Sequence, residues 1–359
     1  MARTGTYSFE DLLANRFQSP RAFGLDNIQP VLDAELAAHD ALVASMISEL
    51  ATPTTEAQEV YGSAVGGDML EVDEYGDAPT QKASPGSTVA YPLKKFQHNL
   101  GWTEEFMLKG TVADMAIKTR NAQIAHKKAI VRDMKRAIYG SSNYAFIDSL
   151  GVPKGVSLTV RRFLNADGEP IPAGPNGEEY DGSTVTHYTA ESTLSNAGLT
   201  ASIRNVVLKG NGAMVRTAIN LANEAAVRGL SGFIPYVDSR LTLNGSANNP
   251  VARTAGNRPD NRPIGILDAT EVWVKPWAVA GYAFTYDAGA SDKPLKMRQE
   301  SIPSLQGLRP TSPDESGLKA HPLYAQLMEA RFGFGVYNRT AGALHEFGVD
   351  TTYTDPVIN

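Results

Sequence analysis

The sequence predicts an α+β protein in which long helices come early in the chain and a mixed region of strands and helices follows. Three observations lead to this class: apolar residues at helical spacing over residues 30–50, a longer helical pattern over residues 103–139, and strand-like patterns across most of residues 151–349. Of the 359 residues, 42% are hydrophobic and 20% are charged, which is ordinary for a folded globular protein. The length allows one large domain or two to three smaller ones.

The first stretch, residues 1–29, is predicted to be an extended arm. Pro20 and Gly24 interrupt regular structure, and the apolar residues around them need a surface to lie against. A helix is expected from Pro30, a favourable first helical residue, to about Leu50, because its apolar residues repeat at intervals of three, four and seven. The arm residues expected to contact a neighbouring subunit are Phe9, Leu12 and Phe17.

Residues 56–100 predict a long β-hairpin. The run from Glu56 to Asp77 carries acidic residues but no lysine or arginine, and a tip rich in proline and glycine separates it from a second extended run, Ser87 to Leu100. An isolated two-stranded hairpin is at best marginally stable in water, so we expect this one to lie on another subunit. The residues expected at that contact are Glu71, Asp73, Glu74, Tyr75 and Lys82.

Residues 103–139 predict the longest helix. Thr103 followed by Glu104 gives a capping start, and Gly110 predicts a break near the beginning. The apolar residues that recur every seven positions, and that are expected to be buried, are Ile117, Ile124, Val131 and Ile138.

Charge differs between the hairpin and this helix, because lysine and arginine dominate residues 114–136. In an assembly of identical chains, the acidic hairpin of one copy can dock on the basic helix of another. Two alternatives stay open: each is merely a solvated face, or the helix faces DNA and makes weak, salt-dependent phosphate contacts. The basic residues expected on this inner surface are Lys118, Lys127, Lys128, Arg132, Lys135 and Arg136.

The rest of the chain alternates strands, turns and short helices. A strand is expected over Val156–Leu164, then a turn-rich insertion and a return strand over Val185–Tyr188. The later predictions are helices over 199–208 and 213–228, a strand over 232–243, paired strands over 264–277 and 280–286, a mostly irregular stretch over 287–320, a short helix over 320–330, and strands over 331–349.

Composition excludes several classes of protein. The absence of cysteine removes disulfides, thiolate nucleophiles and cysteine-ligated zinc. The net charge of −6 argues against a protein that grips nucleic acid over its whole surface, because such proteins concentrate lysine and arginine. No apolar run approaches the length needed to cross a bilayer, and residues 1–9 have no apolar signal core, so neither a membrane anchor nor a secretory signal is expected.

Motifs of enzyme chemistry are also missing. The histidines show no metal-ligand spacing, and the sequence contains no HExxH zinc motif, no GxxxxGK[ST] phosphate loop and no GxSxG elbow. We therefore expect no catalytic residue, cofactor or metal, although a metal site assembled by the fold from distant positions stays open.

The order of elements resembles that of the major capsid proteins of tailed bacteriophages, whose HK97-type fold is shared with encapsulins. Three stretches carry the likeness: the arm, hairpin and long helix, the helix-and-strand block over 196–286, and the aromatic, glycine-rich segment over 332–343. The resemblance implies five parts: an N-terminal arm with a helix (1–55), an E-loop hairpin (56–102), a spine helix with the first part of a P domain (103–195), an A domain (196–290) and a return to the P domain (291–359).

The resemblance also implies a function. Subunits would form hexamers and pentamers in an icosahedral virion capsid around double-stranded DNA, assembled in the host cytoplasm. The implied partners are other copies of the chain, the packaged DNA, and scaffolding, portal and cement proteins, with no membrane. Some members join subunits through a Lys–Asn isopeptide bond assisted by a Glu. The candidates for these three roles are Lys82, Asn338 and Glu346, and the alternative is that all three are ordinary surface or loop residues.

The sequence thus predicts a self-assembling structural protein and not an enzyme. One alternative is the shell protein of an encapsulin-type nanocompartment, and another is an α+β enzyme with unrecognised chemistry. DNA inside native particles would separate phage from encapsulin, and a stable monomer at high concentration would favour the enzyme.

Overall fold

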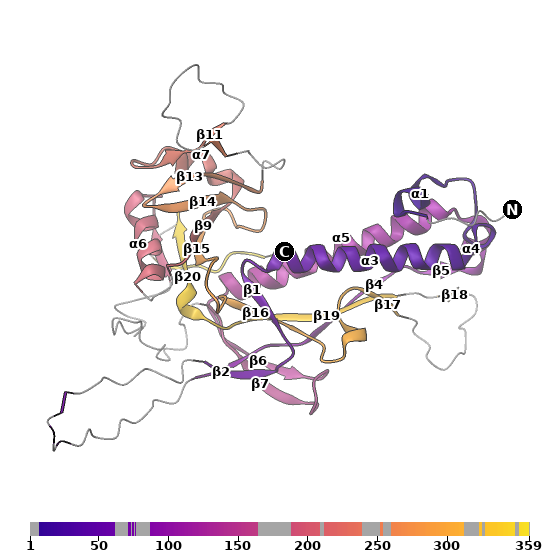
Figure 1. The fold of residues 1–359 in the computed structure, drawn as a ribbon, viewed down its shortest axis with the longest axis horizontal. Helices are drawn as coiled ribbons and strands as arrows, with labels where there is room; N and C mark the ends of the chain where they lie inside the picture. The colour runs from indigo at the N-terminus through magenta and orange to yellow at the C-terminus, as the bar shows by residue number, and fades with distance from the viewer. Residues whose placement is uncertain are drawn as a thin grey trace.

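The computed structural model describes residues 7–61, 71–72, 74, 76, 87–163, 188–208, 212–238, 252–253, 260–311, 323–324, 327–348 and 352–358. The molecule is elongated. Two long helices lie side by side over a five-stranded sheet, and a seven-stranded sheet stands at one end of this body (Figure 1).

The N-terminal residues fold into helices instead of an extended arm. Helices α1 (Phe9–Ala14), α2 (Pro20–Phe23) and α3 (Leu25–Ile47) follow one another closely. Ser8 and Asp11 form a capping box at the start of α1. The segment is fastened to the later helix of the same chain, because the backbone N–H of Val112 donates to the carbonyl of Gln18. The prediction of an extended arm is therefore corrected within the described residues, where this segment is helical and lies against its own chain.

Helix α3 begins five residues before Pro30, which sits inside the helix. Pro30 is the sixth residue of α3, beyond the first four backbone N–H groups that lack an intrahelical acceptor, so its missing N–H removes one hydrogen bond from the helix interior. The predicted apolar stripe is confirmed at Leu32, Leu36 and Val43, which are buried in the main core.

The long helix is broken as predicted near Gly110, into α4 (Glu104–Lys109) and α5 (Val112–Tyr139). Its capping start lies elsewhere than expected: Thr103 belongs to a short strand, and Thr111 with Asp114 forms the capping box of α5. The heptad prediction fails at two positions, because Ile117 and Ile124 are 45% and 46% exposed. A straight helix has 3.6 residues per turn and drifts from a seven-residue repeat, so only Ile138 of the four heptad residues is fully buried. The buried stripe of α5 includes Met115, Ala122, Ile130, Met134 and Ile138.

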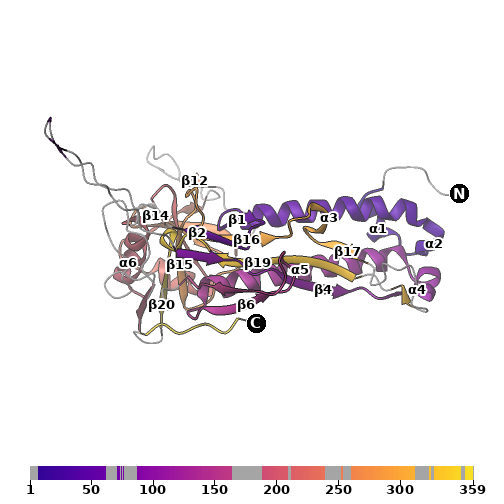
Figure 2. The same ribbon diagram turned by 90° about the horizontal axis from the view of Figure 1, so that it is seen from below.

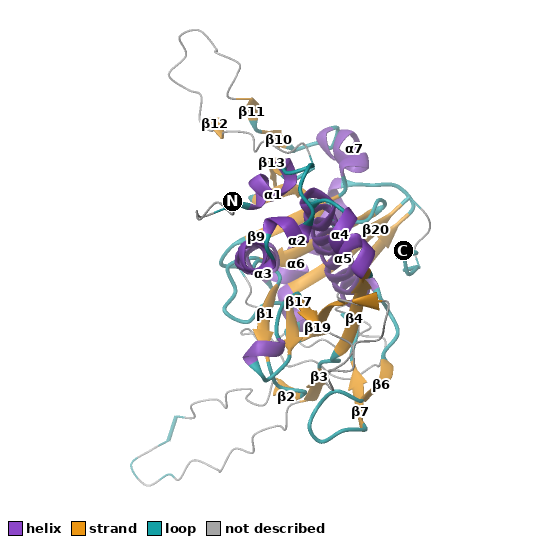
Figure 3. Ribbon diagram, turned by 90° about the vertical axis from the view of Figure 1, so that its right-hand side faces the viewer, coloured by secondary structure: helices purple, strands orange, loops and turns teal. Residues whose placement is uncertain are grey.

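Beneath the helices lies the five-stranded sheet, which runs along the body in the view from below (Figure 2). Only the pairing of β1 with β16 is parallel; the others are antiparallel. Seen along the helices, the helical layer covers one face of the sheet (Figure 3). The strands are β1 (Ala51–Thr54), β16 (Leu295–Gln299), β19 (Leu327–Val336), β17 (Arg309–Thr311) and β4 (Lys94–Asn99), with β19 paired to β16, β17 and β4.

Three predictions change in this sheet. The stretch 287–320 contains β16 and β17. The expected short helix over 320–330 is instead the two-residue strand β18 (Leu323–Tyr324) and the start of β19. Strand β4, predicted as part of the hairpin, pairs with β19 over its whole length.

Four separate two-stranded pairs also occur among the described residues. The predicted hairpin is confirmed at its base, where β2 (Gln58–Tyr61) pairs antiparallel with β3 (Ser87–Ala90). A second hairpin pairs the predicted strand β7 (Val156–Val160) with a strand that was not predicted, β6 (Tyr144–Asp148). The remaining pairs are β5 (Trp102–Thr103) with β18, and β11 (Val237–Asp238) with β12 (Ala252–Arg253).

The seven-stranded sheet carries the helix α6 (Asn196–Val207), which confirms the prediction over 199–208 and packs on β15 and β20. The prediction of a helix over 213–228 is wrong. This stretch forms the strand β9, a 3₁₀ turn and the short helix α7 (Glu224–Arg228). The strands predicted to pair, β14 and β15, are separated by β9. The strand order is β10 (Ile234–Pro235), β13 (Arg262–Leu267), β14 (Thr270–Val274), β9 (Val215–Ile219), β15 (Tyr282–Asp287), β20 (Gly342–Phe347) and β8 (Tyr188–Glu191).

The two sheets are joined by consecutive strands. Strand β19 ends in the five-stranded sheet, and after the 3₁₀ turn Arg339–Ala341 the chain enters the seven-stranded sheet as β20. The predicted unit 291–359 therefore contributes to both sheets. Among the described residues, no helix has both the length and the apolar character required to span a membrane.

Candidate functional site

The candidate contact residues of the N-terminal segment differ in how far their side chains are buried. Phe17 is 97% exposed between α1 and α2. Phe9 is half-buried against the main core, and Leu12 is completely buried in it. The expectation that Leu12 contacts a neighbouring subunit is therefore wrong, because its side chain is enclosed by its own chain.

Of the hairpin candidates, Glu71 and Glu74 are exposed. Asp73, Tyr75 and Lys82 lie outside the described residues. Glu59, at the base of the hairpin, accepts a hydrogen bond from Lys296 of β16, so an acidic residue of the hairpin is already paired within the chain.

The basic residues of α5 do not all lie on one face. Lys128, Arg132 and Arg136 follow at intervals of four and form one partly exposed row. Within the described part of the chain, none of these three has an ion-pair partner. Lys127 lies on another side, close to His39. The Lys118 ammonium lies 4.2 Å from the ring centroid of Phe106, and burial lowers the pKa of Lys135.

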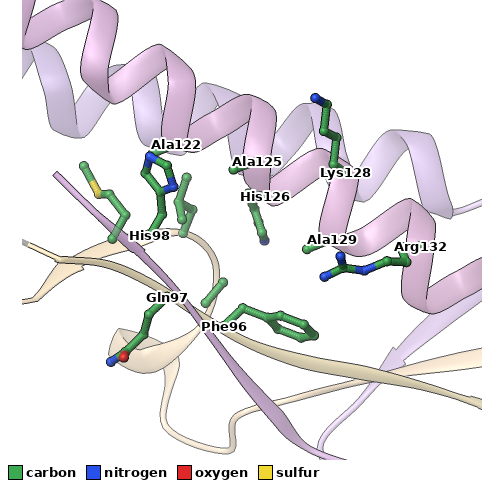
Figure 4. A pocket seen from close by; sticks show the side chains of 12 residues that line it. Phe96, Gln97, His98, Ala122, Ala125, His126, Lys128, Ala129 and Arg132 are labelled. Carbon is green, nitrogen blue, oxygen red and sulfur yellow. The ribbon is translucent and has the colours of Figure 1, made fainter. Parts of the chain in front are cut away.

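A pocket of about 310 Å³ lies between α5 and β4. Figure 4 shows Lys128 and Arg132 on the helix side and Phe96 on the strand side, with His98 and His126 also along the wall. Its lining combines apolar carbons with two cationic groups, which suits an acidic or amphiphilic segment better than a small polar substrate.

Two buried histidines meet between the long helices. His39 Nε2 of α3 and His126 Nδ1 of α5 are 3.0 Å apart and share a hydrogen bond. Burial lowers the pKa of His39 to about 4, and the charge of Lys127 adds to the shift. Burial and the neighbouring His39 likewise lower the pKa of His126 to about 4. Both imidazoles are therefore neutral at pH 7.

Asp40 joins this pair. One ligand atom from each of His39, Asp40 and His126 lies within 4.8 Å of the others. Burial raises the pKa of Asp40 to about 6, against the opposing effect of the backbone N–H of Leu308, which donates to its carboxylate at 3.1 and 3.3 Å. No local pattern in the sequence indicates this cluster, because 87 positions separate the two histidines.

A second polar centre joins the end of α3 to the seven-stranded sheet. Glu49 accepts hydrogen bonds from Arg216 at 2.6 Å, Lys275 at 2.8 Å and Tyr286 at 2.7 Å. Burial raises the pKa of Glu49, but the charge of Lys275 and these hydrogen bonds outweigh it and leave the pKa below its usual value. This carboxylate is the polar connection between the helical body and strands β9, β14 and β15.

A third centre lies within the five-stranded sheet. Glu329 of β19 is buried and pairs with Lys95 at 2.8 Å, Arg309 at 2.8 Å and Arg331 at 2.8 Å, and it also accepts from Gln97 at 3.0 Å. Burial raises the pKa of Glu329, but these donors outweigh it and lower the pKa to about 2.

Two of the three cross-link candidates, Asn338 and Glu346, are buried within their own chain. Asn338 is buried; its side-chain oxygen accepts from Thr340 and its amide donates to the carbonyl of Asp292. Glu346 is buried in β20 and accepts from Tyr282 and from the backbone N–H of Thr354. These engaged groups contradict the predicted roles of Asn338 and Glu346, and Lys82 lies outside the described residues.

His345 forms a triad-like arrangement with Thr189 and Glu191. The His345 ring lies 2.7 Å from Thr189 Oγ1 and 2.9 Å from Glu191 Oε1, which imitates a nucleophile, base and carboxylate. His345 is fully buried, and the other oxygen of Glu191 accepts from Ser195, the cap of α6. A substrate cannot reach this ring, so the arrangement fixes β8, β20 and α6 to one another.

Comparisons with known proteins address the fold. A chain of a solved structure of Mycobacterium phage Patience is 18% identical, with 99% of this chain and 96% of that chain covered and a TM-score of 0.65. A capsid chain of an empty GTA particle is 14% identical, with 84% and 90% covered and a TM-score of 0.47. The SrpI encapsulin of Synechococcus elongatus is 12% identical, with 87% and 90% covered and a TM-score of 0.42. No protein-family model and no curated protein matches the chain.

The likeness to the Mycobacterium phage Patience chain extends over nearly the full length of both chains. The chain therefore has the HK97-type capsid fold.

Proposed function

We propose that this chain is the major capsid protein of a tailed bacteriophage. In this proposal its copies assemble into hexamers and pentamers of an icosahedral shell that encloses double-stranded DNA. The observation that carries the proposal is the match in fold over 99% of the chain to a chain of a phage structure. The shell protein of an encapsulin-type compartment is the second candidate, because it shares this fold class.

The surface of the subunit supports an assembling protein. Three apolar side chains are almost fully exposed: Phe17 at 97%, Val152 at 95% and Val357 at 86%. They lie on separate projections of the elongated body, namely the α1–α2 turn, the β6–β7 hairpin and the C-terminal segment. Burial of such groups against neighbouring copies would gain roughly 1.5–3 kcal/mol for each large side chain.

The packaged DNA is the second partner in this proposal. The row of Lys128, Arg132 and Arg136 offers cations to phosphates without first breaking an ion pair within the described chain. Such contacts are weak, independent of base sequence and sensitive to salt. Scaffolding, portal and cement proteins, and assembly in the host cytoplasm, complete the proposal, as do contacts of the hairpin residues Glu71, Asp73, Glu74, Tyr75 and Lys82 with a neighbour.

Electron microscopy of purified native particles tests the proposal directly. We expect closed shells that contain double-stranded DNA. Closed shells filled with a protein cargo and free of DNA would favour the encapsulin-type compartment. A monomer that stays monomeric at high concentration in sedimentation would contradict both and favour the enzyme alternative.

The contact role of Phe17 has its own test. The substitution Phe17→Ser removes an exposed ring that makes little contact within its own chain, so the circular dichroism and thermal midpoint of the subunit should stay unchanged. Shell yield should fall strongly at equal protein concentration. Equal yields from the Phe17→Ser and unaltered chains would remove Phe17 from the assembly contacts.

A further inference from the structure

The cluster of His39, Asp40 and His126 has the composition of a metal site. Two neutral imidazoles and a carboxylate form a ligand set that zinc uses in proteins, with a fourth position left for water. Their ligand atoms come from two helices and lie within 4.8 Å of one another. No other such group of three or more histidines, cysteines and carboxylates occurs among the described residues.

The spacing of the two imidazoles fits a shared ion. Ligand atoms about 2.0–2.1 Å from a tetrahedral zinc ion lie roughly 3.3 Å apart. His39 Nε2 and His126 Nδ1 are 3.0 Å apart, so a small opening of the pair would admit the ion in place of the shared proton. The rings are tilted by 45° to each other, so their lone pairs can converge without a stacked arrangement.

The carboxylate is held by its own supporting shell. The backbone N–H of Leu308 donates to both oxygens of Asp40. This approach depends on Gly307, which has a φ of +73° and whose missing Cβ would overlap Asp40 Oδ2. Outer contacts of this kind orient metal ligands in known sites.

There is room beside the cluster. A cavity of about 50 Å³ is lined by Asp40, His126, Gln299 and Gly307, among other residues. This volume exceeds the roughly 10–15 Å³ that one water probe occupies. Arg331 also lines the cavity, but its charge is directed into pairs with Glu300 at 3.0 Å and Glu329 at 2.8 Å.

We propose that His39, Asp40 and His126 bind one divalent transition-metal ion of the zinc type, which fastens α3 to α5 and to the loop at Gly307. The ion would connect three parts of the chain that are far apart in the sequence, and would stiffen the helical layer of the subunit. This inference goes beyond the proposed shell function, because it concerns a single folded chain and does not depend on assembly.

The test uses the full, tag-free chain after removal of metals by chelation. We expect one Zn²⁺ per chain by titration calorimetry, and a thermal midpoint that rises with the free Zn²⁺ concentration by mass action. Co²⁺ used as a probe should give the visible absorption of a tetrahedral site. His39→Gln and Asp40→Asn should each weaken Zn²⁺ binding by more than tenfold.

His98→Gln is the matched control, because His98 is a nearby histidine of the pocket wall that does not belong to the cluster. It should bind Zn²⁺ as the unaltered chain does. Asp40→Asn keeps an acceptor for Leu308, so it decides the matter if His39→Gln fails to fold. Two results would overturn the proposal, whether or not shells form. The first is failure of the unaltered chain to take up one Zn²⁺ per chain. The second is binding of Zn²⁺ by both His39→Gln and Asp40→Asn with the affinity of the unaltered chain.

Discussion

Gly307 shows how a single backbone conformation supports a buried acid. Two features of Gly307 each favour glycine: its positive φ and its closeness to Asp40. Gly155 has only the first feature, because its φ is +82° and a Cβ there would meet nothing within 4 Å. Gly155→Ala should therefore cost about 1 kcal/mol through backbone strain alone. Gly307→Ala should cost about 2–4 kcal/mol, because overlap with Asp40 is added. Urea unfolding of the metal-free chains measures both, and equal losses would show that the overlap is relieved without cost.

Glu329 should make the free energy of unfolding of the subunit depend on pH in the acid range. Its folded pKa of about 2 lies below the ordinary value of 4.5, so its contribution to stability is complete above about pH 4.5 and is lost as the pH falls toward 2. The shift corresponds to roughly 3 kcal/mol. Glu329→Gln should be less stable than the unaltered chain by about this amount at pH 7, and the difference should shrink between pH 4.5 and pH 3. Urea unfolding at several pH values measures it, and a difference independent of pH would contradict the assignment.

The limits of prediction at the residue scale follow from distance along the chain. Lys118 to Arg136 lie within one helix, so their basic character could be recognised from sequence. Glu49 meets Arg216, Lys275 and Tyr286 only because a helix end abuts another sheet, and its partners are 167 to 237 positions away. No local pattern reports such a contact, just as none reported the pair His39 and His126.

At the scale of elements, two isoleucines of α5 differ in burial although the sequence alone could not distinguish them. Ile124 is 46% exposed, whereas Ile130 is 1% exposed in the core. Ile130→Ala should cost about 2–5 kcal/mol through loss of apolar contacts and creation of a cavity. Ile124→Ala should change the free energy of unfolding by less than about 1 kcal/mol in the dissociated subunit. Chemical unfolding compares the two, and similar losses would return Ile124 to the buried stripe.

The helices α3 and α6 and the break before α5 were predicted, although α3 has no side-chain cap and begins five residues before the predicted start. The failed helix over 213–228 has a physical explanation. Val215, Thr217 and Ile219 are β-branched and alternate in sequence, but Val215 and Ile219 also match a helical interval of four. Pairing with β14 and β15 on both sides decides in favour of a strand. Such tertiary pairing outweighs local preference and cannot be read from the segment itself.

At the scale of the whole molecule, Glu49 connects the helical body to the seven-stranded sheet. Glu49→Gln leaves the buried Lys275 without its charged partner and leaves the half-buried Arg216 with only the longer pair to Glu271 at 3.5 Å, and should cost about 2–3 kcal/mol. Hydrogen exchange should accelerate in β9 and β14 more than in β19. Glu105→Gln is the control, because its pair with Lys109 is exposed and is worth less than about 1 kcal/mol. Uniform acceleration over both sheets would mean that Glu49 does not act as a local connection.

The positions of β19 and β20 within their two sheets have a consequence for the order in which the sheets form during synthesis. Each is an interior strand of its sheet, β19 between β4 on one side and β16 and β17 on the other, and β20 between β15 and β8, yet both follow residue 326. A chain that has been synthesised only as far as residue 300 therefore holds β1 and β16 without their connection to β4, and holds β8 apart from the other five strands already made for the seven-stranded sheet. Neither sheet is complete until β19 and β20 have been made, so a shorter nascent chain presents unfinished sheet edges to its neighbours.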